Sequence, residues 1–355
     1  MKHKFGMFSD PHIGLNRRAH TTNSSRAALK DALNTAAWDA ATMMKSDNVL
    51  CLGDLFDTSH NDEMTIMQGA QVARHCNLVL GGNHDVPNRE GTLSSLAVVS
   101  EILLADSSVV VPLVGKTFHA VNSFGDDGLV FSVPHQSSQD LFDETIQELI
   151  KEPANDGMLE IVIMHCNYEC GYADNEISLN LTSEVADQLL DRFDYVFIGH
   201  EHESRMLKDD RLVLVGNTHP TSFSDIGDKF VWYINQDNEI EKERIWSKDE
   251  GLATLSFNKL PSNDDDLKTT AQFIDVTGVL PVDEYAGVAD FIVKVWAANP
   301  QALMVRNGLR PIETDDVEEI GLTEIDNLPA HITEELKDDK VMQATWEHYL
   351  EKLGE

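Results

Sequence analysis

The chain is poor in the residue types that mark several protein classes. Its 355 residues include only four cysteines, Cys51, Cys76, Cys166 and Cys170, and their spacing matches no zinc-binding pattern. So few cysteines exclude a small disulfide-bonded fold and favour a reducing compartment. No apolar run approaches the roughly 18 residues that crossing a bilayer requires, and no signal-peptide pattern is recognised. We therefore expect a cytoplasmic protein without a membrane partner.

Basic residues are also scarce. Lys and Arg number 27 against 61 Asp and Glu, which gives a formal net charge of −34 at pH 7. A protein that grips nucleic acid by itself usually presents a basic face, so this balance disfavours tight, autonomous DNA binding. The hydrophobic content of 42% and the length are sufficient for one large domain and a smaller one.

Strand-like and helix-like segments alternate along most of the chain. Short apolar runs at residues 5–8, 49–52, 78–80, 161–164 and 195–198 predict strands. Apolar residues at helical spacing predict helices near 25–45, 62–75, 94–105 and 138–150. This alternation predicts a layered α/β domain over residues 1–255.

The remainder of the chain reads as a separate, smaller unit. After the polar segment 261–266, strand patterns at 273–279 and 291–295 flank a helical pattern at 282–289. We predict a small α+β module over residues 267–325 and a charged helix over 330–355. The apolar stripe of that helix would serve either to dock a partner or to pack on its own domain.

Five polar clusters follow the five predicted strands. Each is common alone, but their joint occurrence after strands is far beyond coincidence. Because ligands at the carboxyl ends of strands converge in α/β sheets, we expect these side chains to meet. The clusters are Asp10-Pro11-His12, Gly53-Asp54-Leu55-Phe56-Asp57, Gly82-Asn83-His84-Asp85, His165, and Gly199-His200-Glu201-His202.

These residue types predict a phosphoesterase centre with two metal ions. Two cations sharing a carboxylate can activate water for attack on phosphorus, and Asp54 is the candidate bridge. Asp10, His12 and a later histidine would complete one site, and Asn83 with two histidines the other. Such mixed ligands favour Mn²⁺, Fe²⁺ or Zn²⁺ over Ca²⁺. His84 would stabilise the transition state or protonate the leaving oxygen, with Asp85 orienting its ring.

The same motifs resemble the calcineurin-like metallophosphoesterase superfamily and, within it, the Mre11/SbcD nuclease family with its bacteriophage recombination-nuclease subunits. Residues 53–58 and 215–223 carry the closer resemblance, which covers about residues 4–246. It implies a four-layer α/β/β/α sandwich followed by a capping-type domain. It also implies that His84 is catalytic and that one Mn²⁺ is held by Asp10, His12, Asp54 and His202, and the other by Asp54, Asn83, His165 and His200.

The resemblance implies a Mn²⁺-dependent DNA exo/endonuclease subunit acting at DNA ends, in the host cytoplasm if a bacteriophage encodes it. Because the chain has no P-loop, ATP hydrolysis would come from a Rad50/SbcC-type coiled-coil ATPase. Members of that family also form homodimers. Weaker candidates for substrate contacts are Arg17, Arg18, Asp57 and Arg89.

Two other functions are open. A small-molecule phosphodiesterase or phosphatase of the same superfamily would suit the acidic composition and the lack of a basic stripe. A non-catalytic scaffold is the third hypothesis, and the complete ligand set argues against it.

Overall fold

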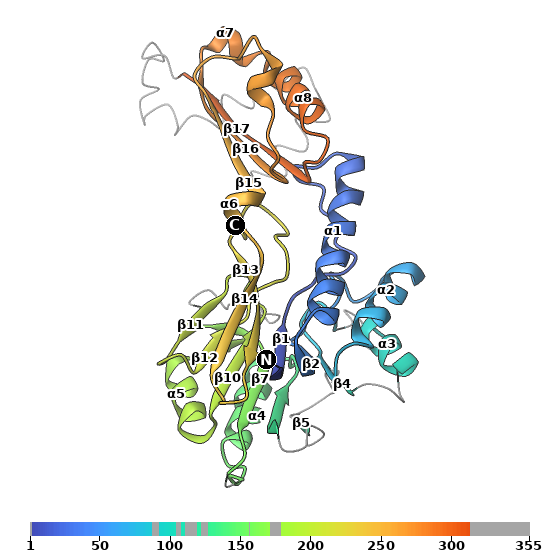
Figure 1. Cartoon of the computed structure of the whole chain (residues 1–355), viewed down its shortest axis with the longest axis vertical. Helices are drawn as coiled ribbons and strands as arrows, with labels where there is room; N and C mark the ends of the chain where they lie inside the picture. Colours follow the sequence, from blue (N-terminus) through green and yellow to red (C-terminus); the bar gives the residue numbers. More distant parts are fainter. Residues whose placement is uncertain are drawn as a thin grey trace, which may run out of the picture.

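The computed structural model describes residues 2–86, 92–103, 108–110, 119–121, 127–155, 157–170 and 179–312. Its larger part is built on two six-stranded sheets (Figure 1). The first has the order β14-β13-β1-β2-β3-β4, in which four parallel strands are extended by an antiparallel hairpin. Its strands are β1 (His3–Phe8), β2 (Ser46–Cys51), β3 (Leu78–Leu80), β4 (Ser108–Val110), β13 (Lys229–Ile234) and β14 (Ile240–Trp246).

The second sheet has the order β11-β12-β10-β7-β6-β5. Four parallel strands form its centre and an antiparallel strand lies at each edge. Its strands are β5 (His119–Val121), β6 (Leu129–Val133), β7 (Glu160–His165), β10 (Tyr195–Gly199), β11 (Arg205–Leu207) and β12 (Leu212–Leu214), and a small ribbon pairs β8 (Asn167–Tyr168) with β9 (Asn180–Leu181). The five strands predicted ahead of the polar clusters are all present.

Helices cover the outer face of each sheet. The first sheet packs against α1 (Asn23–Thr42), α2 (Glu63–Ala73) and α3 (Ser95–Leu103), and the second against α4 (Gln139–Leu149) and α5 (Ser183–Arg192). Side-chain caps start these helices: Thr22 caps α1 in a reciprocal pair with Ser25, and Asp62 caps α2. The four predicted helices are confirmed, whereas α5 was not predicted.

Three buried clusters separate four layers. One lies between α1–α3 and the first sheet, one between α4–α5 and the second sheet, and the third between the two sheets. Trp232 in the central cluster is fully buried, and its indole N–H donates to the carbonyl of Val215 at 3.0 Å. The expected α/β/β/α sandwich is therefore the observed fold.

A smaller parallel sheet follows, with the order β15-β16-β17. Its strands are β15 (Leu252–Phe257), β16 (Phe273–Leu280) and β17 (Met304–Pro311), with the short helices α6 (Lys248–Gly251) and α7 (Val282–Tyr285), a 3₁₀ turn at Asp264–Leu267, and α8 (Val288–Ala298). The first strand lies ahead of the polar segment 261–266 that suggested a boundary. The predicted helix at 330–355 lies outside the described residues.

One element of the small sheet was predicted wrongly. Residues 291–295 are β-branched and aromatic, which suggested a strand, but they lie within α8. Val288, Phe291 and Val295 are the buried positions of α8, and their spacing of three and four residues is helical. The small sheet needs this helix to cover its core, and tertiary packing therefore overrides the local strand preference.

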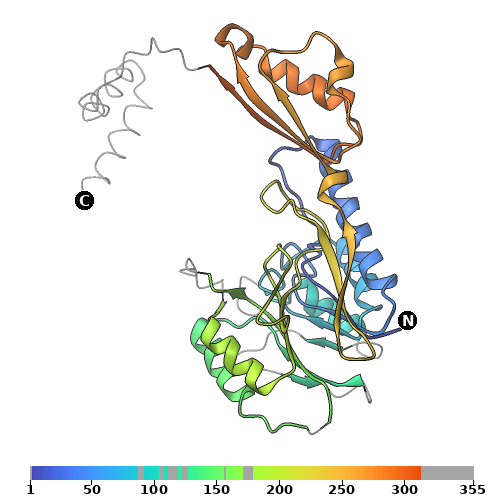
Figure 2. The same ribbon diagram turned by 60° about the vertical axis from the view of Figure 1, so that its left-hand side comes forward.

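The small sheet packs against the α/β/β/α sandwich through α1 and the loop before it (Figures 1 and 2). Leu29 and Leu33 of α1 pack in one cluster with Phe273 and Met304 of the small sheet. The N–H of Val305 donates to the carbonyl of His20 at 3.0 Å. Within the described part of the chain, no helix combines the length and apolarity needed to cross a membrane.

Candidate metal centre

The seven expected metal ligands all reach one region at the carboxyl ends of the central strands. Two short bridges, Ser9 with Asn217 and Ile13 with Phe56, hold the ligand-bearing loops in register. The ligands are Asp10 and His12 after β1, Asp54 after β2, Asn83 after β3, His165 at the end of β7, and His200 and His202 after β10.

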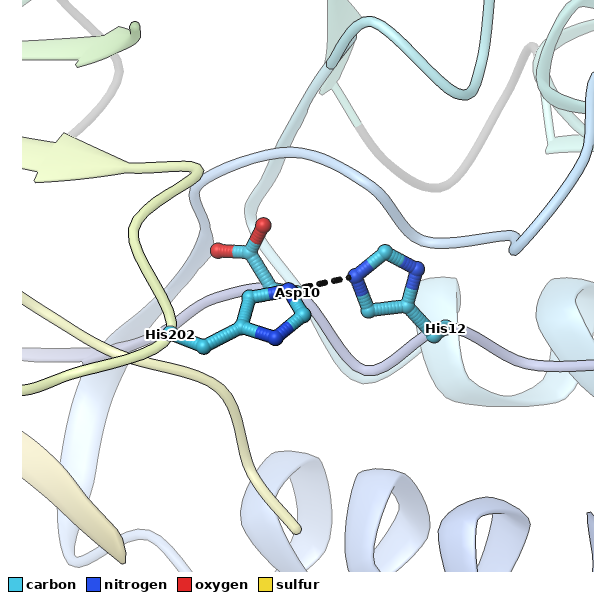
Figure 3. Close-up of side chains that lie close together, drawn as sticks. All are labelled: Asp10, His12 and His202. Carbon is cyan, nitrogen blue, oxygen red and sulfur yellow. Dashed lines mark hydrogen bonds between the residues drawn. The ribbon is translucent and has the colours of Figure 1, made fainter. Parts of the chain in front are cut away.

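Asp10, His12 and His202 form the first ligand group (Figure 3). The Nε2 atoms of His12 and His202 face one another at 3.0 Å. Metal–nitrogen bonds of about 2.0–2.1 Å place two ligands of one ion about 3.0–3.4 Å apart at ordinary coordination angles. The two ring nitrogens therefore lie where a shared cation would hold them.

Asp54, His165 and His200 form the second ligand group, with Asn83 among them. The Asn83 side-chain oxygen lies 3.0 Å from His165 Nε2 and 2.9 Å from His200 Nδ1. A neutral amide oxygen and two ring nitrogens at these separations are a ligand set suited to a divalent transition metal.

Asp54 lies between the two groups. Its Oδ2 atom is 3.4 Å from His165 Nε2 and 4.0 Å from Nε2 of both His12 and His84. Burial alone would raise the pKa of Asp54, but His165, His12 and His84 outweigh burial and hold that pKa well below its usual range. The carboxylate is thus ionised and placed to serve both groups.

Several ligands are held in a backbone conformation that L-residues seldom adopt. Asp10, His12 and Asp54 have φ values of 51°, 46° and 48°, and His200 has 92°. Such strain is characteristic of functional sites, because surrounding structure must maintain it. Gly53, at φ 109°, allows close packing beneath the site, since a Cβ there would lie 2.2 Å from His165 Nδ1.

Hydrogen bonds select which ring nitrogen faces the centre. Nδ1 of His165 donates to the carbonyl of Leu52 at 2.9 Å, so Nε2 is the atom that points inward, and in the neutral ring it carries the lone pair. Such outer contacts fix the tautomer of metal-binding histidines. His200 differs from His12, His165 and His202, which face the centre with Nε2. In His200 it is Nδ1 that faces Asn83.

Asp85 does not orient the His84 ring, contrary to our expectation. Its buried carboxylate accepts backbone N–H groups of Leu55 and Phe56 at 3.2 Å and of Gly82 at 3.1 Å. Burial and the charge of Asp54 raise the pKa of Asp85 to about 7. The bonds from Leu55 and Phe56 tie the Asp54 loop to the Asn83 loop, and the His84 ring is held elsewhere, by the Asp57 carbonyl.

The weaker candidates occupy different surroundings. The Asp57 carboxylate is 3.5 Å from His12 Nδ1, so it lies behind a ligand rather than in the open site. Arg17 and the exposed Arg18 lie on the loop that joins β1 to α1, where Thr21 donates to both carbonyls. Their contact with a phosphate backbone stays a prediction. Arg89 lies outside the described residues.

Sequence reasoning missed three buried residues around the centre. His135 lies in the loop after β6, where burial and the neighbouring His165 lower its pKa to about 3, and its backbone N–H donates to the carbonyl of Gly81 at 2.9 Å. Asp225 lies 3.0 Å from His202, and the Lys229 ammonium donates to the carbonyl of His202. All three are distant in sequence from the motifs, and only the fold brings them near.

A comparison with known protein families identifies the family to which this chain belongs. The calcineurin-like phosphoesterase family model matches residues 3–204. Among solved structures, a putative 5′-nucleotidase from Staphylococcus aureus matches with a TM-score of 0.35 and 11% identity over 68% of this chain. The chain spans about half, 52%, of that protein's length. With the family model covering more than half of its residues, the chain belongs to the calcineurin-like phosphoesterases.

Proposed function

We propose that this chain is a Mn²⁺-dependent nuclease subunit that hydrolyses phosphodiester bonds at DNA ends, alongside a Rad50/SbcC-type coiled-coil ATPase. The proposal rests on the different solvent exposure of the side chains in the site. The side chains of His12, Asp54 and His165 are at most 4% exposed and that of His202 is 28% exposed, whereas that of His84 is 41% exposed. The more buried side chains would hold the ions, and His84, the most exposed of these five, would meet an extended substrate from solvent.

The ligand set suits a pair of divalent metal ions, and the bound ions would supply the hydrolytic chemistry. Two divalent ions, when bound, would lower the pKa of a water and neutralise charge on a phosphodiester. The protein's own part is to hold Asp54 ionised between the two groups and to direct His84 Nε2 to the same side. Burial would lower the pKa of His84, but Asp54 and the Asp57 carbonyl outweigh it and raise the pKa. His84 is therefore suited to donate a proton to the leaving oxygen.

A small-molecule phosphodiesterase or phosphatase is the second candidate. The net charge of −34 favours it, because DNA would meet a repulsive surface unless a partner supplied basic residues. The association with a partner ATPase and the formation of a homodimer are both proposed from the motif resemblance.

The test is Mn²⁺-dependent degradation of end-labelled single- and double-stranded DNA, with a chromogenic phosphodiester in parallel and Asp54→Asn as the control. We expect the wild-type chain to degrade DNA and the variant to be inactive on both substrates. Turnover of the small ester with DNA left intact, even after addition of the ATPase, would contradict the nuclease proposal in favour of the second candidate.

A further inference from the structure

Asp225 is the centre of a dense hydrogen-bond network behind His202. Its side chain is 8% exposed, and its Oδ2 accepts from His202 Nδ1 at 3.0 Å, from Asn217 Nδ2 at 2.9 Å and from the N–H and hydroxyl of Thr221 at 2.9 and 2.8 Å. Its Oδ1 accepts from the N–H and hydroxyl of Ser222 at 2.7 and 3.0 Å. Each oxygen is therefore surrounded by donors, and the carboxylate acts only as an acceptor.

This network determines the tautomer of His202. Because the Asp225 carboxylate only accepts, His202 Nδ1 must carry a proton, and in the neutral ring Nε2 then keeps its lone pair. That Nε2 atom is the one that faces His12 Nε2 at 3.0 Å. The contact therefore turns the metal-binding atom of His202 towards the first ligand group.

Lys229 fixes the same arrangement through the backbone. It is 1% exposed, and its ammonium donates to the carbonyl of His202 at 3.0 Å and to the carbonyl of Asp225 at 2.6 Å. One buried cation thus joins the main chain of both residues. Burying a lysine ammonium costs free energy unless hydrogen bonds replace its contacts with water. The two bonds to the main chain offset that cost for Lys229.

We propose that Asp225 is a positioning residue for the first metal site: it holds His202 in the tautomer that binds a divalent cation. The inference rests on the proposed metal-dependent function. Outer partners of this kind change metal affinity by about 10–100-fold when removed. The effect should be confined to the site of Asp10, His12 and His202, because the side chain of Asp225 hydrogen-bonds to His202 and not to Asn83, His165 or His200.

Asp225→Asn tests the proposal on the full chain, with binding of Mn²⁺ measured by calorimetry. The amide offers a donor, which lets His202 Nδ1 become the acceptor and moves the proton to Nε2. We expect one of two Mn²⁺ sites to weaken by about 10–100-fold and the other to stay unchanged. Histidine ¹⁵N spectra of the metal-free protein should show the Nδ1–H form of His202 in the wild type and its loss in the variant.

Two control variants distinguish loss of the contact that positions His202 from a general loosening of the loop around Asp225. Asp228→Asn alters a carboxylate three residues away that bonds the N–H of Lys248 and Arg244, and it should bind Mn²⁺ as the wild type does. Thr221→Val with Ser222→Ala removes two hydroxyl donors but leaves the His202 contact, and it should also keep both sites.

Three results would overturn the proposal. They are unchanged affinity in Asp225→Asn, an equal loss in the Thr221/Ser222 variant, and an unaltered His202 tautomer. A wild-type chain that takes up no Mn²⁺ would overturn the proposed function as well, which distinguishes the two failures.

Discussion

The ring of His84 is held by the backbone of Asp57: its Nδ1 donates to the Asp57 carbonyl at 2.5 Å. The main-chain N–H of His84 also donates to Asp54 Oδ1 at 2.9 Å. Both contacts leave His84 Nε2 free on the side of the Asp54 carboxylate, 4.0 Å from Oδ2. The exposed imidazole is therefore oriented without being buried among the ligands.

His84→Gln should abolish hydrolysis while leaving metal uptake intact. The variant removes a proton donor whose contribution is about 10²–10⁴-fold in rate. His84 also lies within reach of His12 and Asp54, but its side chain is 41% exposed and it belongs to neither of the two ligand groups described above. Steady-state rates on a chromogenic phosphodiester and metal analysis of the same samples check this, and equal loss of metal and activity would make His84 a ligand instead.

Gly82→Ala should disturb the centre through a steric contact. A Cβ at Gly82 would lie 2.2 Å from Asp54 Oδ1 and 2.4 Å from the Asp54 nitrogen, so the Asp54 carboxylate would have to move. We expect weaker Mn²⁺ binding and slower hydrolysis. Gly227→Ala, where nothing lies within 4 Å of the added carbon, is the matched control. Wild-type Mn²⁺ affinity in Gly82→Ala would show that the two loops are not tightly packed.

The ion pair of Glu160 with Arg192 should give a pH-dependent part of the stability. Burial would raise the pKa of Glu160, but hydrogen bonds from Arg192 and Asn155 outweigh it and lower the pKa. A lowered carboxylate pKa stabilises the fold above the unfolded value of about 4.3, and this stability is lost as the pH falls through the folded value.

Urea unfolding of the wild type and of Glu160→Gln measures that contribution. The difference in the free energy of unfolding should be largest near pH 6 and shrink towards pH 3. A difference that stays constant over this range would show that Glu160 titrates alike in the folded and unfolded chains.

Local patterns were enough to predict which side chains meet at the candidate centre, because each stands at or shortly after the end of a strand and carries metal-binding chemistry in its own side chain. Asp10, Asn83 and His165 are brought together in this way, and their binding of a metal stays a prediction. The support behind them was not predictable by the same means. Asp225 follows His202 by 23 residues in a polar loop, and only the return of the chain to β13 places it there. Asp85 was found, but its backbone partners depend on how two loops meet.

The helices show the same limit. Residues 25–45 present a long apolar face, and α1 was predicted within a few residues of its ends. In α8 the aromatic and β-branched residues give a strand-like sequence pattern. The segment is nevertheless helical, because a helix lets Val288, Phe291 and Val295 pack on the small sheet. Packing against distant elements determines that this segment is a helix, and such packing cannot be read from a short stretch of sequence.

The most direct test of the account is the number of Mn²⁺ ions bound by the wild type and by Asp54→Asn. Because Asp54 lies within reach of both ligand groups, we predict two ions per wild-type chain and weakening of both sites in the variant. An Asp54→Asn chain that still binds two ions with wild-type affinity, or a wild-type chain that binds only one, would contradict a centre built on a shared carboxylate.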